Sequence, residues 1–250
     1  MPAQEIIVRP DPRSVARTAA ERFVTLGKAA VIARGSFSVA LAGGRTPEEM
    51  YRHLANEEFA AHVEWARTHI FWGDERCVPP DDPESNFRLA HTRLLSNVLI
   101  PAASIHRIRG ELAPSSAAEA YAAELRAFFG TPWPRFDLVL LGMGSDGHIA
   151  SLFADSAALN ETARPVVAVT AHYADRPACR VTLTAPAINA ARHVMFQVTG
   201  EGKAATLQKV LEGARGSYPA QWIQPTDGTL TWIVDAAAAS QLSTSTLGSG

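Results

Sequence analysis

The fold of this chain is best judged from an apolar strand that runs directly into a glycine-rich turn. The segment spans residues 136–153 and reads FDLVLLGMGSDGHIASLF. Its apolar run predicts a buried strand over residues 137–141, and the glycines after it predict a tight turn that carries Asp146 and His148. Ligands of α/β proteins bind outside the carboxyl ends of the strands. His148 is therefore a candidate proton-transfer group, with Asp146 beside it.

The same turn also matches a dinucleotide-binding fingerprint, G-x-G-x-x-G, through Gly142, Gly144 and Gly147. That fingerprint requires a βαβ unit with an acidic residue about 20 residues further on, after the next strand. The next apolar run, at residues 166–170, is followed by Ala-His rather than by an acid. We therefore favour a turn that carries catalytic side chains over a nucleotide site.

Apolar segments of strand and helix type alternate along the rest of the chain. Strands are expected at residues 36–42, 69–72, 137–141, 166–170, 180–183, 194–198 and 230–234, and helices at 12–34, 47–56, 84–98, 117–129, 185–190 and 202–211. This order predicts one α/β domain over residues 1–250, a Rossmann-like, mostly parallel sheet with helices on both faces. Residues 243–250 are rich in Ser, Thr and Gly and are expected to fray.

Charge and cysteine content exclude several classes of partner. A net charge of −2 provides no basic field for nucleic acid, so local cations would have to bind an anionic ligand. The two cysteines, Cys77 and Cys179, make neither a disulfide framework nor a metal cluster, and they fit a reducing, cytoplasmic location. No segment resembles a signal peptide or a membrane helix. We expect no nucleic-acid, membrane or metal partner, and a monomer or a weak homodimer.

A first candidate anion site is the segment AGGRTPEE, which follows a predicted strand and begins a helix. Thr46 is expected to be the N-cap, with Pro47 at the first helical position and Glu49 completing a capping box. Gly43 and Gly44 allow backbone N–H groups to face a phosphate at the positive end of the helix dipole. A well-capped turn without a ligand explains the same residues. The missing lysine excludes a standard P-loop.

A second candidate site is the charged run WGDERCVPP after another predicted strand. Asp74 is a candidate catalytic carboxylate, and Arg76 can bind a phosphate or carboxylate with two hydrogen bonds. The alternative is a solvated loop, in which Ser85 and Asn86 merely cap the next helix.

Two further cations, Arg180 and Lys203, lie at later strand–helix junctions. Together with the glycine segment at residues 43–46 they would form one anion pocket.

Five motifs, in this order and spacing, resemble those of the 6-phosphogluconolactonase family: LAGGRTP, WGDERCVPPDDPESNF, LLGMGSDGHIASLF, RVTLTAPAIN and VTGEGKA. The resemblance covers nearly the whole chain. It implies the fold of the glucosamine-6-phosphate deaminases, which some bacterial regulators share as a sugar-binding domain. It also implies hydrolysis of 6-phospho-D-glucono-1,5-lactone to 6-phosphogluconate, the second step of the oxidative pentose phosphate pathway, with no metal or nucleotide cofactor.

The resemblance assigns roles to individual residues. His148 matches the catalytic histidine, which would take a proton from water attacking C1 and return it to the ring oxygen, and Arg76 matches an active-site arginine. Asp146 could orient His148 or a sugar hydroxyl. The implied phosphate site consists of Gly43, Gly44, Thr46, Arg180 and Lys203. Arg45 stands where many relatives carry serine, so it either adds a phosphate contact or faces solvent.

Two alternatives share the fold. Glucosamine-6-phosphate deaminases carry D-G-H-I-A-F-N-E in the turn, with a glutamate that supports the histidine, whereas here the turn continues Ser151-Leu152-Phe153. A sugar-phosphate sensor would carry a DNA-binding module ahead of the sugar domain. About 35 residues precede the first predicted strand at 36–42, and they read as one strand and one long helix.

Overall fold

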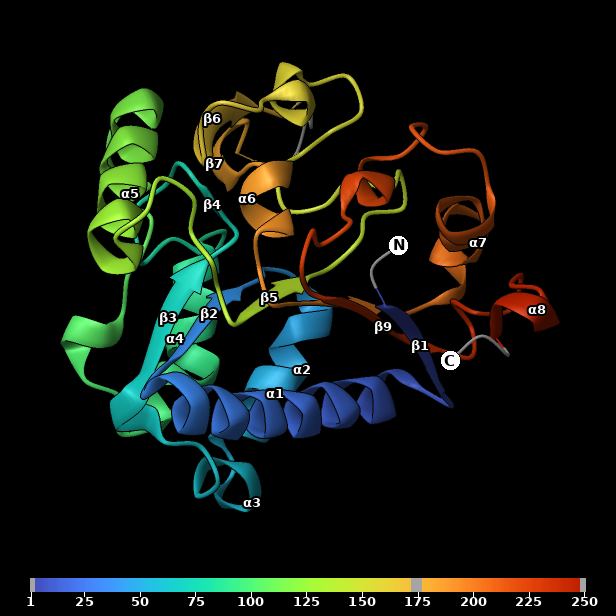
Figure 1. Cartoon of the computed structure of the whole chain (residues 1–250), viewed down its shortest axis with the longest axis horizontal. Helices are drawn as coiled ribbons and strands as arrows, with labels where there is room; N and C mark the ends of the chain where they lie inside the picture. Colours follow the sequence, from blue (N-terminus) through green and yellow to red (C-terminus); the bar gives the residue numbers. More distant parts are fainter. Residues whose placement is uncertain (1–2, 172–176, 248–250) are drawn as a thin grey trace.

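The computed structural model describes residues 3–171 and 177–247. Its main sheet has six strands, all parallel, in the order β1-β9-β8-β5-β2-β3 (Figure 1). The strands are β1 (Ala3–Arg9), β2 (Phe37–Leu41), β3 (Thr68–Trp72), β5 (Leu138–Leu141), β8 (His193–Val198) and β9 (Thr229–Asp235). Every residue of β2 and β5 is buried, as expected of central strands covered on both faces. The mostly parallel sheet is therefore confirmed, with β1 at the edge beyond β9.

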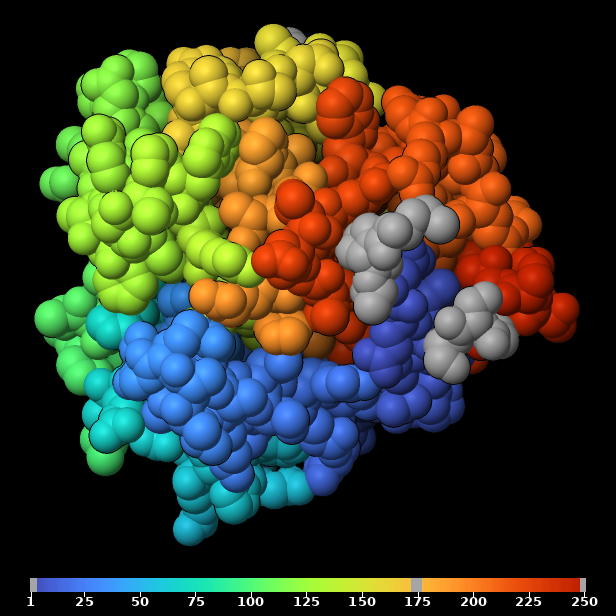
Figure 2. All heavy atoms as spheres, in the orientation of Figure 1, coloured from blue at the N-terminus to red at the C-terminus, as the bar shows by residue number. Residues whose placement is uncertain are grey.

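Helices cover both faces of this sheet. They are α1 (Pro12–Arg34), α2 (Arg45–Ala55), α3 (Glu57–Ala60), α4 (Asn86–Arg93), α5 (Pro114–Phe129), α6 (Ala185–Asn189), α7 (Ala204–Glu212) and α8 (Thr244–Leu247). Figure 1 shows α1 and α2 on one side of the sheet, and α5, α6 and α7 on the other. In the same orientation, Figure 2 shows α1 in blue across the lower half of this face.

Helix α1 has the bounds that its sequence predicts. The Asp11 side chain accepts a hydrogen bond from Ser14 N at 2.8 Å, Pro12 occupies the first helical position, and Gly35 ends the helix at φ 81°. Phe23, on the inward face, is fully buried. All three end signals are local in sequence, which explains why the boundaries can be predicted.

A second, three-stranded sheet is not predicted by the sequence. Strands β4 (Asp74–Arg76), β7 (Cys179–Leu183) and β6 (Val166–Thr170) pair antiparallel in the order β4-β7-β6, with α5 packed against β6 and β7. The expectation that residues 166–170 and 180–183 join the parallel sheet is wrong, because a short apolar run predicts a strand but not its partner. Gly73 connects the two sheets: its N–H donates to Leu41 O, and its carbonyl accepts from Leu183 N.

Two further expectations are corrected. Residues 84–98 form α4 and a separate 3₁₀ turn at Leu95–Asn97 rather than one helix. The end of the chain is not frayed up to residue 247, because the Ser243 hydroxyl and the Thr246 hydroxyl both donate to the Glu212 carboxylate and hold α8. Residues 248–250, and His172 in the segment 172–176, lie outside the described residues.

The order of the strands predicts a ligand site at the carboxyl ends of the parallel strands. The chain leaves β2 towards β3 and leaves β5 towards β8, so the strand order reverses between the neighbours β2 and β5. The carboxyl ends of parallel strands at such a reversal form a crevice. Within residues 3–171 and 177–247, none of the helices combines the length and apolar character that a bilayer crossing requires.

Candidate active site

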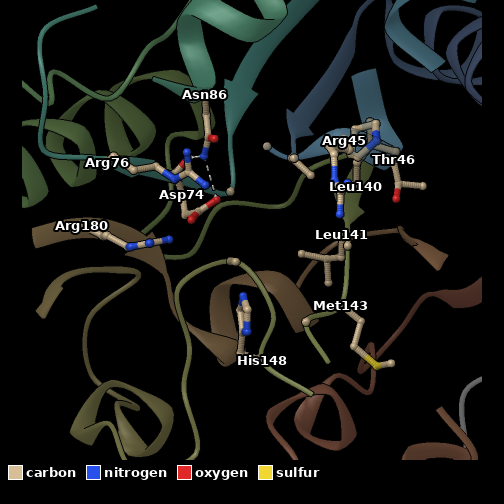
Figure 3. A pocket seen from close by; sticks show the side chains of 18 of the residues that line it. Arg45, Thr46, Asp74, Arg76, Asn86, Leu140, Leu141, Met143, His148 and Arg180 are labelled. Carbon is tan, nitrogen blue, oxygen red and sulfur yellow. Dashed lines mark hydrogen bonds between the residues drawn. The ribbon is translucent and has the colours of Figure 1, made fainter. Parts of the chain in front are cut away.

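A cavity opens where β2, β3, β5 and β8 end. Its volume is about 190 Å³. Nine of the ten residues predicted for the site line it: Gly43, Gly44, Arg45, Thr46, Asp74, Arg76, His148, Arg180 and Lys203. The tenth, Asp146, hydrogen-bonds to one of these nine. Figure 3 shows Arg76 and Arg180 on one side of the cavity, Arg45 and Thr46 on the other, and His148 between them.

His148 is oriented by Asp146 within the glycine turn. Asp146 Oδ1 lies 2.5 Å from His148 Nδ1 and 3.2 Å from the His148 backbone N. The hydrogen bond from the imidazole, reinforced by its charge, holds the pKa of Asp146 at about 2, although partial burial opposes this shift. The carboxylate is therefore an acceptor, so Nδ1 carries the hydrogen in the neutral ring and the lone pair lies on Nε2. A lone pair on Nε2 is what a general base requires.

Gly144 makes this pair possible. A Cβ atom at Gly144 would lie 2.1 Å from His148 Nδ1 and 2.4 Å from Asp146 Oδ1. The Gly144 N–H also donates to His148 O, and the Gly147 N–H donates to Gly144 O. Glycine is therefore required at position 144 to leave room for the Asp146 and His148 side chains, and not to bind a nucleotide.

Asp74 is held from two sides at the bottom of the cavity. It is 6% exposed, its Oδ2 accepts from the Ser151 hydroxyl at 2.7 Å, and its Oδ1 accepts from Asn86 Nδ2 at 3.1 Å. The same Asn86 amide also donates to the Asp74 backbone carbonyl at 2.9 Å. With both oxygens bonded, Asp74 is well placed to position neighbouring groups and poorly placed to move a proton.

Glu75 has a structural role. Its buried carboxylate accepts from the backbone N–H groups of Asn86 and Phe87, both at 2.7 Å, and from the Ser85 hydroxyl. Burial raises the pKa of Glu75, and these hydrogen bonds oppose the rise. Ser85 caps α4 by accepting from Arg88 N. The interpretation of Ser85 as a cap is confirmed, and Glu75 satisfies the remaining donors of that helix end.

Arg76 and Arg180 lie side by side on the neighbouring strands β4 and β7 of the small sheet. They are register partners in the antiparallel pair β4–β7, and both line the cavity. Arg180 is 3% exposed and its Nε donates to Pro177 O, while Arg76 donates to Glu84 O. Like charges directly opposite one another are destabilising without an anion between them. The pair therefore favours an anionic group in this part of the cavity.

The start of α2 differs from the predicted capping box. The helix begins at Arg45 with Gly44 as the N-cap at φ 99°, so Thr46 lies inside the first turn. Thr46 Oγ1 is 3.1 Å from Thr199 Oγ1, and Glu49 pairs with Arg52. Across the described part of the chain, no side chain caps the α2 N-terminus. Its backbone N–H groups are thus available to an anion in the cavity.

Lys203 closes the other side of the cavity. Its Nζ donates to Met143 O, which ties the turn after β8 to the turn after β5. Burial lowers the pKa of Lys203, and the nearby Arg45 guanidinium lowers it further, against the opposing effect of Asp146 and Asp235. The cations thus form two groups, Arg45 with Lys203 and Arg76 with Arg180. All four cations line the same cavity, and the single anion pocket stays a prediction.

Three supporting residues escape sequence reasoning. The pattern around Asn86 predicts only a cap, Ser151 stands out only as a departure from the deaminase motif, and no motif singles out Asp235. Asp235 is 2% exposed and accepts from the Gly200 N–H, which fixes the turn that presents Lys203. Asp235 could have been recognised because it is a polar residue at the end of an otherwise apolar strand, β9. The structure shows no group of three or more His, Cys, Asp or Glu side chains suited to a metal among its described residues.

Comparisons with known proteins agree with this geometry. A family model described as glucosamine-6-phosphate isomerases/6-phosphogluconolactonase matches residues 10–232. A 6-phosphogluconolactonase from Nostoc sp. is 38% identical over 94% of this chain and 97% of its own. A probable chloroplastic 6-phosphogluconolactonase 3 from rice (Oryza sativa subsp. indica) is 37% identical over 92% of this chain and 73% of its own. The solved structure of 6-phosphogluconolactonase from Trypanosoma cruzi superposes with a TM-score of 0.87 at 31% identity, covering 96% of this chain and 97% of the other.

Proposed function

The chain belongs to the glucosamine-6-phosphate isomerase/6-phosphogluconolactonase family, and from this premise we infer that it is a 6-phosphogluconolactonase. It hydrolyses 6-phospho-D-glucono-1,5-lactone to 6-phosphogluconate in the oxidative pentose phosphate pathway. The observation that carries this proposal is the 2.5 Å contact between Asp146 and His148 in a cavity with cations at both ends. A base between two positive ends suits a substrate with a phosphate at one end and a carbonyl at the other.

His148 supplies the base. A lactone is an activated ester, so positioning a water molecule and removing its proton is the main demand, worth about 10²–10⁴-fold. Nε2 accepts the proton of the water that attacks C1 and then returns it to the ring oxygen as the C1–O bond breaks. Asp146 remains ionised throughout and stabilises the transient imidazolium.

The developing oxyanion is assigned to the arginines. The backbone N–H groups of Gly144, Gly147 and His148 all donate within the turn, so they are engaged already. Arg76 and Arg180 also donate hydrogen bonds, to Glu84 O and Pro177 O, but each guanidinium has several N–H donors and both side chains line the cavity. Donors fixed in place before the reaction stabilise charge that appears only in the transition state. This assignment moves Arg180 from the phosphate site, where the resemblance places it, to the carbonyl end.

The phosphate is assigned to the opposite end. The uncapped first turn of α2, with Gly43, Gly44 and Thr46, offers backbone donors, and Arg45 and Lys203 offer positive charge. Arg45 lines the cavity and is itself exposed, which suits a phosphate contact at the mouth of the cavity. Binding energy from this remote group holds the lactone for attack at C1.

One side chain favours the lactonase over the deaminase alternative. The deaminase motif has a glutamate five residues after its histidine. Phe153 occupies that position here, and its ring centroid is 4.9 Å from that of His148. The carboxylate partner of His148 comes instead from Asp146.

We propose a cytoplasmic location and a monomer or weak homodimer. Both cysteines are thiols, which fits a reducing compartment. The rice relative carries the word chloroplastic in its name, so a fractionated cell extract probed for this chain is the direct test of location. Analytical ultracentrifugation over a range of concentrations tests the oligomeric state.

The proposed function is tested by the rate of opening of 6-phosphogluconolactone, freshly generated from glucose 6-phosphate, against the spontaneous rate. We expect the wild type to exceed the background clearly, and His148→Ala to lose about 10²-fold or more of that excess. Acceleration that survives in the variant would exclude His148 as the base. No acceleration by the wild type, together with ammonia release from glucosamine 6-phosphate, would replace the lactonase with a deaminase.

A further inference from the structure

The two cysteines of the chain are cross-strand neighbours. Strands β4 and β7 pair antiparallel up to the partners Arg76 and Arg180. One step beyond this pair, the Cys77 N–H donates to the Cys179 carbonyl at 2.9 Å. The chain contains no other cysteine. Two thiols that lie about 100 positions apart in sequence are thus brought opposite each other at the end of the small sheet.

Both cysteine side chains lie on the same face of that sheet. Side chains alternate along a strand, and Arg76 and Arg180 line the cavity. Cys77 and Cys179 therefore lie on the opposite face, away from the substrate. Hydrogen-bonded antiparallel partners have Cα atoms about 5.5 Å apart. Disulfides span Cα separations of about 4.4–6.8 Å, a range that includes this spacing.

The two thiols differ in access. Cys179 is exposed, whereas Cys77 is half-buried and packs against the core. Burial raises the pKa of the Cys77 thiol to about 11, and the proximity of Cys179 and Glu75 adds to the rise. An external reagent therefore meets Cys179 first, and Cys77 reacts second, within the same molecule.

We propose that Cys77 and Cys179 are a redox modification site, a dithiol that low-molecular-weight disulfides of the glutathione class convert to an intramolecular disulfide. The Cys179 thiolate attacks the oxidised reagent, forms a mixed disulfide and releases one reagent thiol. Cys77 then loses its proton to solvent and attacks Cys179 Sγ, and the second reagent thiol leaves. The two protein thiols are oxidised by two electrons, and one reagent disulfide is reduced to two thiols.

The position of this bond gives it a structural effect. Arg76 and Arg180 lie opposite each other one residue inward, in the three-residue β4–β7 ladder. A disulfide one step outward holds the two strands together. It also closes a loop of about 100 residues in the unfolded chain, for which we expect Tm to rise by roughly 5–10 °C.

The test uses the full-length chain and requires no activity measurement, so its outcome is independent of the proposed function. The protein is incubated with oxidised glutathione, freed of reagent, and analysed for intact mass, free thiols and Tm, with and without dithiothreitol. We expect the wild type to lose both thiols together, to retain no glutathione, and to gain the higher Tm reversibly. Cys77→Ser should retain a glutathione adduct on Cys179, and Cys179→Ser should react much more slowly.

Three results for the wild type would overturn the proposal. They are retention of both thiols under these conditions, accumulation of a stable glutathione adduct, and formation of disulfide-linked dimers. If either serine variant fails to fold, the comparison of oxidised with reduced wild-type protein is sufficient to test the proposal.

Discussion

Asp146 Oδ1 lies 2.5 Å from His148 Nδ1, and the two residues belong to one turn whose glycines leave room for both side chains. Because they are only two positions apart, their pairing depends on the conformation of this turn. Lys203 and Thr206 support the turn from α7 and the segment before it, through hydrogen bonds to Met143 O and Ser145 O.

Substitution of the carboxylate should lower kcat. In Asp146→Asn the amide can donate to Nδ1, which would place the hydrogen on Nε2 and remove the base. We expect kcat for 6-phosphogluconolactone to fall by about 10²–10⁴-fold with a small change in KM, because the phosphate contacts are untouched. Asp155→Asn, at an exposed position nearby, is the matched control and should retain wild-type kcat. Unchanged kcat in Asp146→Asn would show that the carboxylate does not orient the imidazole.

The same carboxylate should also make a pH-dependent contribution to stability. Its pKa falls from the ordinary 3.8 to about 2 in the folded protein, chiefly through the hydrogen bond from His148. A depressed pKa means that the ionised form is favoured in the folded state, so the contribution is present above pH 3.8 and is lost as the pH falls through about 2. Denaturant unfolding of the wild type and Asp146→Asn should show a stability difference that shrinks over this range. A difference that stays constant there would contradict the assigned cause.

Gly144→Ala should separate the pair by steric conflict. The added methyl would lie 2.1 Å from the His148 ring, so the imidazole must move. We expect kcat to fall by at least about tenfold, the loss typical of a misplaced catalytic group. Gly202→Ala is the control, since a methyl there meets nothing within 4 Å among the described residues and Gly202 does not line the cavity. Equal kcat in the two variants would refute the steric argument.

Sequence alone predicts those parts of the fold whose signals are local. Helix α1 carries its N-cap, its proline and its terminal glycine within a few residues of its ends, and its bounds are as predicted. Strands β6 and β7 carry the same apolar signal as the strands of the main sheet, and they nevertheless pair in a separate sheet. Which strand pairs with which depends on Gly73 and on contacts between distant segments, and a periodic pattern does not contain this information.

The residues of the candidate site also fall into those that the sequence predicts and those that it does not. The candidate residues at strand ends can be recognised because each lies in a short motif with its own chemistry, as His148 does. The residues that hold them in place cannot be recognised in this way, because they are remote in sequence. The Ser151 hydroxyl donates to Asp74, 77 positions away, and the Asp235 carboxylate accepts from the Gly200 N–H, 35 positions away. The expected cap at Thr46 is wrong because the helix starts two residues earlier, with Gly44 as the N-cap at a positive φ.

Lys203 should report on the phosphate end of the substrate. Lys203→Met removes a charge but keeps much of the side-chain length. A hydrogen bond to a charged group is worth about 1.5–3 kcal/mol. We therefore expect kcat/KM for 6-phosphogluconolactone to fall by about 10–150-fold, and that for unphosphorylated gluconolactone to change little. Lys209→Met, on the exposed side of α7, is the control. An equal loss on both lactones would place Lys203 at the reacting end instead.

Arg180 should behave in the opposite way. It faces Arg76 across β4 and β7, and we assign this pair to the oxyanion, which both lactones develop. Arg180→Met should therefore lower kcat by a similar factor for the phosphorylated and the unphosphorylated lactone, by about 10²–10³-fold if it is a principal donor. The measurement is the ratio of the two kcat/KM values in each variant: it should change in Lys203→Met and stay constant in Arg180→Met. A loss confined to the phosphorylated lactone would return Arg180 to the phosphate site, and the oxyanion would then depend on Arg76.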